Sequence, residues 1–212
     1  MSEPLAIVTL SVGAFESNCY LICDAGTCVL IDPGADLARI EAELERRGAQ
    51  PEAIWLTHGH ADHVHALAGL LARRPVPVVL HAADATWAFG EANRIPPWYD
   101  TPPPRPADLR LAAAGSAPPG LGGEARVIET PGHSPGSVCY HFPERGWLFS
   151  GDTLFHGSVG RTDLPGSDPT AMSASLATLA ALPPDTRVFP GHGPPTTIDE
   201  ERRTNAFLRE LA

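Results

Sequence analysis

One six-residue segment, residues 58–63 with the sequence HGHADH, constrains the fold of this chain more than any other. It holds three of the nine histidines in a chain of 212 residues, so chance clustering is a poor explanation. An apolar run at residues 53–57 precedes it, and a helical pattern at residues 63–73 follows, which places it between a buried strand and a helix. Such turns carry the ligand-binding loops of α/β folds. The segment therefore predicts an α/β fold with a polar site at its rim.

The rest of the chain alternates between strand-like and helical periods. Asp36 is expected to cap a helix that ends at Gly48, and Asp168 followed by Pro169 is typical of the start of another helix. A short helix is expected from about residue 199. Strands are expected at residues 6–12, 18–23, 28–32, 126–129, 137–142, 147–149 and 187–190. Each half runs strands first and helices after, which predicts two packed sheets with helices on both outer faces.

Residues 96–119 contain eight prolines, which oppose both helices and central strands. This segment is expected to be a long loop or a lid. No linker interrupts the pattern elsewhere, so residues 1–212 are expected to form a single domain.

Composition excludes several classes of function. The net charge of −10 and the absence of clustered basic residues argue against a nucleic-acid partner. All 15 basic residues are arginines, so Schiff-base chemistry on a lysine is excluded. There is no run of about 20 apolar residues to span a membrane and no leader-like pattern in residues 1–10. The four cysteines lack a CxxC spacing, so we expect reduced core residues in a cytoplasmic protein.

Three further segments place a metal-capable residue directly after a glycine near the end of a strand. They are residues 130–133 (TPGH), 149–152 (FSGD) and 189–192 (FPGH). Glycine lets the backbone approach a ligand closely, so each segment can direct His133, Asp152 or His192 to the rim. Together with the first segment they supply seven imidazole and carboxylate ligands, which zinc and similar divalent metals prefer.

These motifs carry a resemblance to a known family. The segments THGHADH, PGHSPGS, FSGDTLF and PGHG occur in the order typical of the metallo-β-lactamase fold superfamily. NCYLI at residues 18–22 and VLIDPG at residues 29–34 are similar to the opening of its glyoxalase II branch. The resemblance implies a four-layer αββα sandwich of two mixed β-sheets.

The resemblance also implies a ligand assignment for two divalent metal ions, zinc or alternatively iron or manganese. His58, His60 and His133 would hold one ion, whereas Asp62, His63 and His192 would hold the other. Asp152 would bridge the two ions, and Asp62 would in addition orient the attacking hydroxide as a catalytic residue. The implied substrate is a small-molecule thioester of the S-2-hydroxyacyl-glutathione type, whose thiolate leaves without a strong general acid.

Substrate recognition is expected to involve Arg161. The stretch GRTDLP at residues 160–165 resembles a segment of small glyoxalase II-like proteins, which makes Arg161 a candidate for holding a substrate carboxylate or carbonyl. The alternative is a structural arginine paired with Asp163 or Asp168. The glutathione-binding helical extension of larger glyoxalases II has no counterpart after His192, which leaves the thiol carrier open.

Two other functions compete with thioester hydrolysis. Persulfide dioxygenases resemble this chain in fold and use a single iron, which His58, His133 and Asp152 would hold here. Persulfide dioxygenases typically have a PAHDY-like segment around the last histidine. This chain has PGHGP at residues 190–194 instead, which favours the hydrolase. A metal-binding protein without catalysis would need the ligands but no open pocket. The other histidines match no ligand position: His65, His81, His141 and His156.

Overall fold

A computed structural model describes residues 5–24 and 26–210 of the chain, so residues 1–4, on which the leader prediction partly rests, lie outside it. The first sheet has six strands in chain order. Strands β1 to β3 form an antiparallel meander, and β3 to β6 are parallel. The bounds are β1 (Ala6–Val12), β2 (Ser17–Asp24), β3 (Thr27–Ile31), β4 (Gln50–Trp55), β5 (Val78–His81) and β6 (Leu109–Ala112).

The second sheet has five strands in the order β13-β12-β9-β8-β7. Because β8 is antiparallel to both β7 and β9, and β9 is parallel to β12, the strands β7, β9 and β12 all run in one direction. A two-stranded ribbon, β10 with β11, follows β9. The bounds are β7 (Arg126–Glu129), β8 (Val138–Phe142), β9 (Trp147–Gly151), β10 (Leu154–Phe155), β11 (Ser158–Val159), β12 (Arg187–Pro190) and β13 (Thr196–Thr197).

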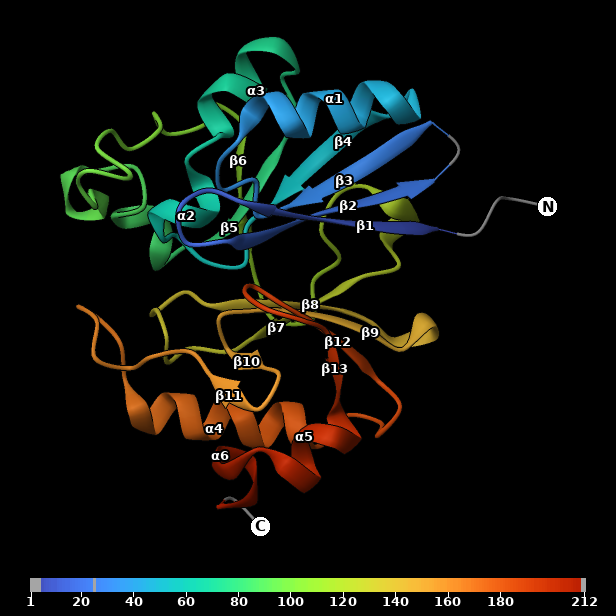
Figure 1. The fold of residues 1–212 in the computed structure, drawn as a ribbon, viewed down its shortest axis with the longest axis vertical. Coiled ribbons are helices and arrows are strands. Elements are labelled where there is room, and N and C mark those ends of the chain that lie inside the picture. The colour runs from blue at the N-terminus through green and yellow to red at the C-terminus, as the bar shows by residue number, and fades with distance from the viewer. Residues whose placement is uncertain (1–4, 25, 211–212) are drawn as a thin grey trace.

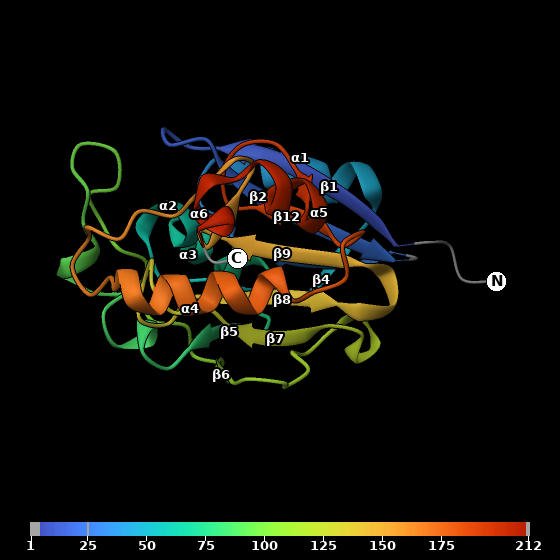
Figure 2. The ribbon, with the colours of Figure 1, turned by 90° about the horizontal axis from the view of Figure 1, so that it is seen from below.

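Helices cover the outer face of each sheet, so the molecule has four layers (Figure 1). Figure 2 shows α4 crossing the outer face of the second sheet. Helices α1 (Leu37–Arg47) and α3 (Leu67–Arg73) cover the first sheet; α4 (Pro169–Ala180), α5 (Ile198–Thr204) and α6 (Ala206–Arg209) cover the second. The αββα sandwich expected from the sequence is therefore confirmed.

Strand alternation builds three separate apolar cores. Along β2 and β3, Leu21 and Leu30 pack beneath α1 and α3, while Ile22 and Ile31 face the second sheet. The core between the sheets is rich in aromatic rings, including Trp55, which also donates a hydrogen bond to the Pro119 carbonyl at 2.9 Å. Side chains pointing to opposite faces at successive positions require a layer on each side, which is the physical reason for the sandwich.

The helix expected at residues 63–73 is broken in the structure, and its first part begins earlier. It forms α2 (Ala61–Val64) and then α3. The Asp62 carbonyl accepts a hydrogen bond from Ser17 Oγ at 2.6 Å, and the Ala66 amide donates to the Pro33 carbonyl at 3.1 Å. The Ala66-to-Asp62 bond of a continuous helix is therefore replaced by two tertiary bonds, and the chain turns.

Helix ends agree with the sequence at two of three positions. Gly48 ends α1 in the left-handed conformation, and the Asp168 carboxylate accepts the amides of Thr170 and Ala171 at the start of α4. Asp36 precedes α1 but does not cap it, because its carboxylate accepts the Gly13 amide instead. The expected cap was wrong in its contact, although the helix begins at the expected place.

The proline-rich segment is more ordered than expected. It contains β6, which pairs in parallel with β5 at the edge of the first sheet, and β5 itself was not predicted. The prolines of the segment flank β6 at residues 96–106 and 118–119, so an edge strand fits between them. A loop over the whole of residues 96–119 was therefore wrong.

All four cysteines are buried and free, as expected: Cys19, Cys23, Cys28 and Cys139. Among the described residues, no helix has the length and apolar character needed to cross a membrane.

Candidate metal centre

Five strands end at one edge of the sandwich, and each is followed by a polar residue that faces the same place. Asp32 follows β3, His58 follows β4, and His133, Asp152 and His192 follow β7, β9 and β12. Because β3 and β4 are parallel, as are β7, β9 and β12, their carboxyl ends meet at this edge. The first sheet and the second therefore each supply part of one site, as in other α/β folds.

The first ligand group consists of His58, His60 and His133. Their imidazole centroids lie 4.7 to 4.9 Å apart, and the rings are close to perpendicular. His60 Nδ1 lies 2.9 Å from His133 Nε2. One ligand atom from each ring lies within 4.8 Å of the others, a spacing that suits a single metal ion.

The second ligand group consists of Asp62, His63 and His192. Asp62 Oδ2 lies 3.3 Å from the Nε2 atoms of both His63 and His192. The three ligand atoms again lie within 4.8 Å of one another.

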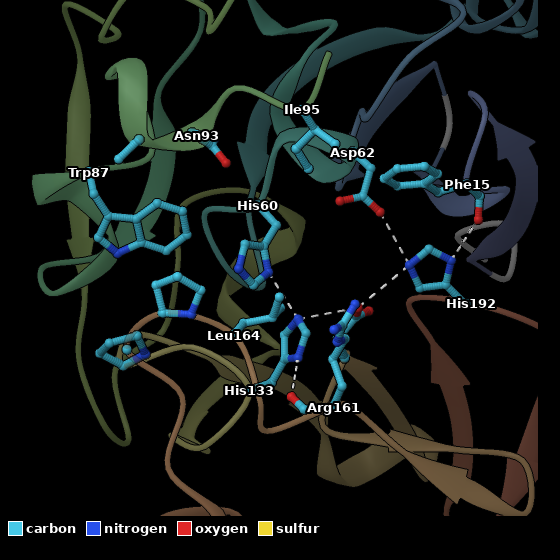
Figure 3. Close-up of a pocket in the computed structure, with 15 residues that line it drawn as sticks. Phe15, His60, Asp62, Trp87, Asn93, Ile95, His133, Arg161, Leu164 and His192 are labelled. Carbon is cyan, nitrogen blue, oxygen red and sulfur yellow. Dashed lines mark hydrogen bonds and ion pairs between the residues drawn. The ribbon is translucent and has the colours of Figure 1, made fainter. Parts of the chain in front are cut away.

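Asp152 lies between the two groups. Its carboxylate oxygens are 3.4 Å from His133 Nε2 of the first group and 3.5 Å from His63 Nε2 and His192 Nε2 of the second. A β-carbon on Gly191 would lie only 2.0 Å from Asp152 Oδ1, so the glycine before His192 permits this close approach. The structure thus brings all seven sequence-predicted ligands together (Figure 3 shows those that line the cavity).

Hydrogen bonds on the outer side of the imidazoles turn their Nε2 atoms inward. The Nδ1 atoms of His133 and His192 pair with the carbonyls of Arg161 and Phe15 at 2.9 and 3.0 Å. His63 Nδ1 pairs with Asp32 Oδ2 at 3.1 Å. An Nδ1–H donated to an oxygen leaves the Nε2 lone pair free to bind a metal.

Orphaned polar atoms test whether these residues fit a metal. Among the described residues, His58 Nε2, His63 Nε2 and Asp152 Oδ1 are buried without a hydrogen-bond partner. Three such atoms in one cluster are costly in a dry interior. Divalent metal ions would satisfy all three at once, so the donor set fits a metal centre.

Two buried carboxylates support the centre and were not singled out by the sequence. Asp32 accepts the Thr57 amide at 2.7 Å and its hydroxyl at 2.6 Å, in addition to His63 Nδ1. Asp84 accepts the amides of Gly59 and Gly136 at 2.8 and 2.7 Å. Asp32 therefore orients His63 of the second group directly and, through Thr57 Oγ1, which lies 3.0 Å from His58 Nδ1, also supports the first group. Asp84 ties together the two loops of the first group. The only signal for Asp32 was its place in the VLIDPG motif.

The start of β2 holds the loop that carries His192. Asn18 Nδ2 donates to the carbonyls of Pro190 and Gly193 at 3.0 and 2.9 Å, and the Tyr20 hydroxyl donates to Pro190 at 2.6 Å. These contacts join residues 170 or more positions apart in the chain, so no local pattern could have shown their purpose.

The two groups differ in their electrostatics. Burial and the neighbouring His133 lower the pKa of His60 to about 4, and burial with the other imidazoles lowers the pKa of His58. Burial alone would also lower the pKa of His192, but hydrogen bonds and charges from Asp152 and Asp62 raise it to about 9. The same carboxylates raise the pKa of His63 against the effect of its burial. Without metal, His58 and His60 of the first group are neutral at pH 7, and the second group is an ion-paired cluster.

A cavity of about 680 Å³ opens onto the two groups. His60, Asp62, His133, Asp152 and His192 line its floor, and its walls include Phe15, Trp87, Ile95, Leu164 and Pro165 (Figure 3). The ligands are therefore accessible to a small molecule, which a purely structural metal site would not need.

Arg161 reaches this cavity but is already paired. Its guanidinium contacts the Asp163 carboxylate through two bonds of 2.6 and 2.9 Å, and its side chain is 63% exposed. The structural pairing with Asp163 is thus present, and the backbone carbonyl of Arg161 has the separate role of orienting His133. The other four histidines lie outside both groups: His65, His81, His141 and His156.

Comparisons with known proteins agree with this geometry. The sequence is 34% identical over 204 residues to "Probable metallo-hydrolase YqgX" of Bacillus subtilis, covering 94% of this chain and 95% of that protein. It is 31% identical over 216 residues to "Hydroxyacylglutathione hydrolase GloC" of Haemophilus influenzae, covering 95% and 97% of the two chains.

Solved structures are similar over nearly the whole chain. BLEG-1, described as a B3 metallo-β-lactamase, has a TM-score of 0.87 at 38% identity and covers 96% of this chain and 99% of its own. TTHA1623 in a di-iron-bound form has a TM-score of 0.86 at 44% identity and covers 95% and 100%. The family model of the metallo-β-lactamase superfamily matches residues 12–192. The chain therefore belongs to the metallo-β-lactamase superfamily.

Proposed function

We propose that this protein is a thioester hydrolase that acts on S-2-hydroxyacyl-glutathione or a closely similar thiol ester at a two-metal centre. The observation that carries the proposal is the convergence of seven imidazole and carboxylate ligands at the floor of an open cavity, with the Nε2 atoms of His63, His133 and His192 turned toward one another's group. The relative from Haemophilus influenzae, which is named for this activity, supports the choice of substrate class.

In this proposal His58, His60 and His133 hold one divalent ion and Asp62, His63 and His192 hold the other, with Asp152 shared between them. Bound divalent ions supply Lewis-acid polarisation of the substrate carbonyl and lower the pKa of a water molecule toward neutrality. The di-iron form of TTHA1623 supports two sites of this kind, and zinc, iron and manganese remain the candidates for the native metal.

Asp62 is the proposed catalytic carboxylate. It lines the cavity, and the charges of His63 and His192 lower its pKa despite its burial, so it is ionised at neutral pH. An ionised carboxylate in this position accepts a hydrogen bond from an attacking water and so orients it toward the carbonyl.

The leaving group needs no dedicated acid. A thiol has a pKa near 8.5, so a thiolate departs readily at neutral pH. Asp62, Asp152 and Arg161 line the cavity, and the chain has no lysine. These side chains do not supply the proton that an amine leaving group needs, whereas a thiolate needs none. The lining therefore favours a thioester over an amide.

Two measurements on the purified protein test the proposal: metal content per chain, and activity on matched substrates. The substrates are S-lactoylglutathione, glutathione persulfide with oxygen uptake, and a β-lactam; the last is included because BLEG-1 is described as a β-lactamase. About two metals per chain with thioester hydrolysis is the expected result. A single iron with oxygen consumption would establish the persulfide dioxygenase alternative instead, and metal without turnover of any substrate would indicate a binding protein.

A further inference from the structure

The walls of the cavity are apolar, and three separate segments of the chain supply them. Phe15 comes from the turn between β1 and β2, Trp87 and Ile95 come from the segment between β5 and β6, and Leu164 comes from the loop after β11 (Figure 3). Residues from three segments form a wall only in the folded chain, so this surface is a feature of the tertiary structure.

Positive charge on these walls is scarce. Within the described residues, Arg161 is the only arginine that lines the cavity, and Asp163 already neutralises it. Apart from Asn93, the rest of the wall is apolar and consists of Phe15, Trp87, Ile95 and Leu164 together with Ala92, Gly166 and two prolines. Such walls offer few charged partners to the two carboxylates of a peptide thiol such as glutathione. They favour the burial of an apolar group instead.

Trp87 lies beside the first ligand group. Its ring centroid lies 5.2 Å from that of His60. Apolar surface therefore begins directly beside the metal ligands, within reach of a group close to the reacting carbonyl. On the thiol side, a peptide thiol such as glutathione has a single methylene and then polar amides.

The position of Trp87 is set by the same residue that supports the ligand loop. The Trp87 amide donates to the Asp84 carbonyl at 3.1 Å, while the Asp84 carboxylate accepts the Gly59 amide. A β-carbon on Gly59 would lie 3.2 Å from the Trp87 ring, so the ring packs directly over this glycine. Trp87 and the loop that carries His60 are thus held as one unit, which makes the wall rigid.

We propose that the acyl group of the substrate is aromatic or branched aliphatic and that Trp87 is the residue that selects it. This inference rests on the proposed thioester hydrolysis and adds the class of acyl group. The carbonyl lies over the ligands, the apolar acyl group packs against Trp87 and Leu164, and the polar thiol arm extends toward solvent past Arg161.

Two thioesters that share glutathione and the 2-hydroxyl group test the inference. S-mandeloylglutathione carries a phenyl group where S-lactoylglutathione carries a methyl. After each kcat/KM is divided by the rate of uncatalysed alkaline hydrolysis, the mandeloyl ester is expected to be favoured by about tenfold or more, because each methylene buried in an apolar pocket is worth about tenfold.

Trp87→Ala is expected to remove most of that preference, and Trp87→Phe is expected to retain most of it. Phe207→Ala is the matched control, since Phe207 is a large side chain, 48% exposed on α6, that does not line the cavity. Circular dichroism and metal content verify that each variant is folded and loaded. If the alanine variant does not fold, Trp87→Gln, which replaces the indole by a polar side chain, is expected to remove the preference instead, and Leu164→Ala is expected to reduce it.

Equal normalised rates for the two esters in the unmodified protein would overturn the inference and leave thioester hydrolysis standing. A preference that survives in a folded, metal-loaded Trp87→Ala variant would overturn the role of Trp87. Failure of the loaded enzyme to cleave either ester would overturn the proposed function, and the inference with it.

Discussion

The two ligand groups lie side by side but solve the problem of burying polar side chains in different ways. The first group has three imidazoles without a carboxylate of its own, and burial keeps His58 and His60 neutral: the pKa of His60 falls to about 4. The second group pairs two imidazoles with carboxylates, and the pKa of His192 rises to about 9. The first group is thus ready to accept a cation at pH 7, whereas the second must exchange protons for one.

The buried supports of the two groups overlap only in part. Asp32 contacts His63 of the second group directly and reaches His58 of the first through Thr57, whereas Asp84 fixes the backbone on both sides of the first. Substitution of Asp84 is therefore directed at the first group, and substitution of Asp32 acts most strongly on the second.

The largest effect is expected for Asp152→Ala, because the Asp152 carboxylate lies 3.4 to 3.5 Å from ligands of both groups. Lewis-acid stabilisation is worth several kcal/mol, so kcat/KM should fall by about a thousandfold or more. Metal content measured by mass spectrometry should fall as well. Unchanged metal content in this variant would contradict the bridging position of Asp152.

A smaller and more selective effect is expected for Asp32→Asn and Asp84→Asn. Loss of a carboxylate that orients a metal ligand typically weakens metal binding by 10- to 100-fold. Competition with a chelator should show that Asp32→Asn weakens binding mainly of the metal held by the second group. Asp84→Asn should weaken binding of the metal held by the first group. Asp108→Asn is the control, because Asp108 is exposed and contacts only Arg110 among charged groups. Loss of the same metal in both variants would contradict separate supports.

The metal-free protein should lose stability as the pH rises. The pKa of His192 is about 9 in the folded state against about 6.5 when unfolded, so its contribution is complete below pH 6.5 and disappears as the pH rises through 9. Urea unfolding after chelation should show a fall in the free energy of unfolding on the order of 2 kcal/mol between pH 6.5 and 9.

His192→Gln should flatten this pH profile, and metal loading should remove it, because bound metal keeps the imidazoles neutral. Comparison with the variant also separates the contribution of His192 from that of the buried cysteines. Burial raises the pKa of Cys139, for example, to about 12, so its effect on the free energy of unfolding begins above pH 8.5. An unfolding free energy that does not change with pH in the metal-free protein would contradict the ion-paired second group.

The smallest effect is expected for Arg161→Ala. Its charge is shared with Asp163 and exposed to water, so it contributes little to binding. KM for the thioester should rise about threefold, as expected for an exposed ionic contact, with kcat and metal content unchanged. A fall in metal content would show instead that the side chain is needed to place the carbonyl that orients His133.

Much of the fold could be predicted from the sequence, and so could the seven candidate ligands that the structure brings together. The pattern of a strand followed by a glycine and a ligand is local, so His133, Asp152 and His192 could be placed at strand ends from their neighbours, and the apolar run before His58 placed it in the same way. Two packed sheets with helices on both outer faces followed from the order of strands and helices in each half, and the resemblance implied the four αββα layers. The strands β5 and β6 were missed, since short apolar runs next to prolines carry a weak local signal.

The sequence by itself determined which residues are chemically able to bind metal and at which turns they occur. Only the tertiary structure decided that His58 and His60 are neutral while the second group is ion-paired, because pKa values depend on distances between residues on different strands. The break between α2 and α3, the supports from Asp32 and Asp84, and the apolar wall at Trp87 likewise arise from contacts between distant segments. Local patterns describe neighbours along the chain, and these features are made by neighbours in space.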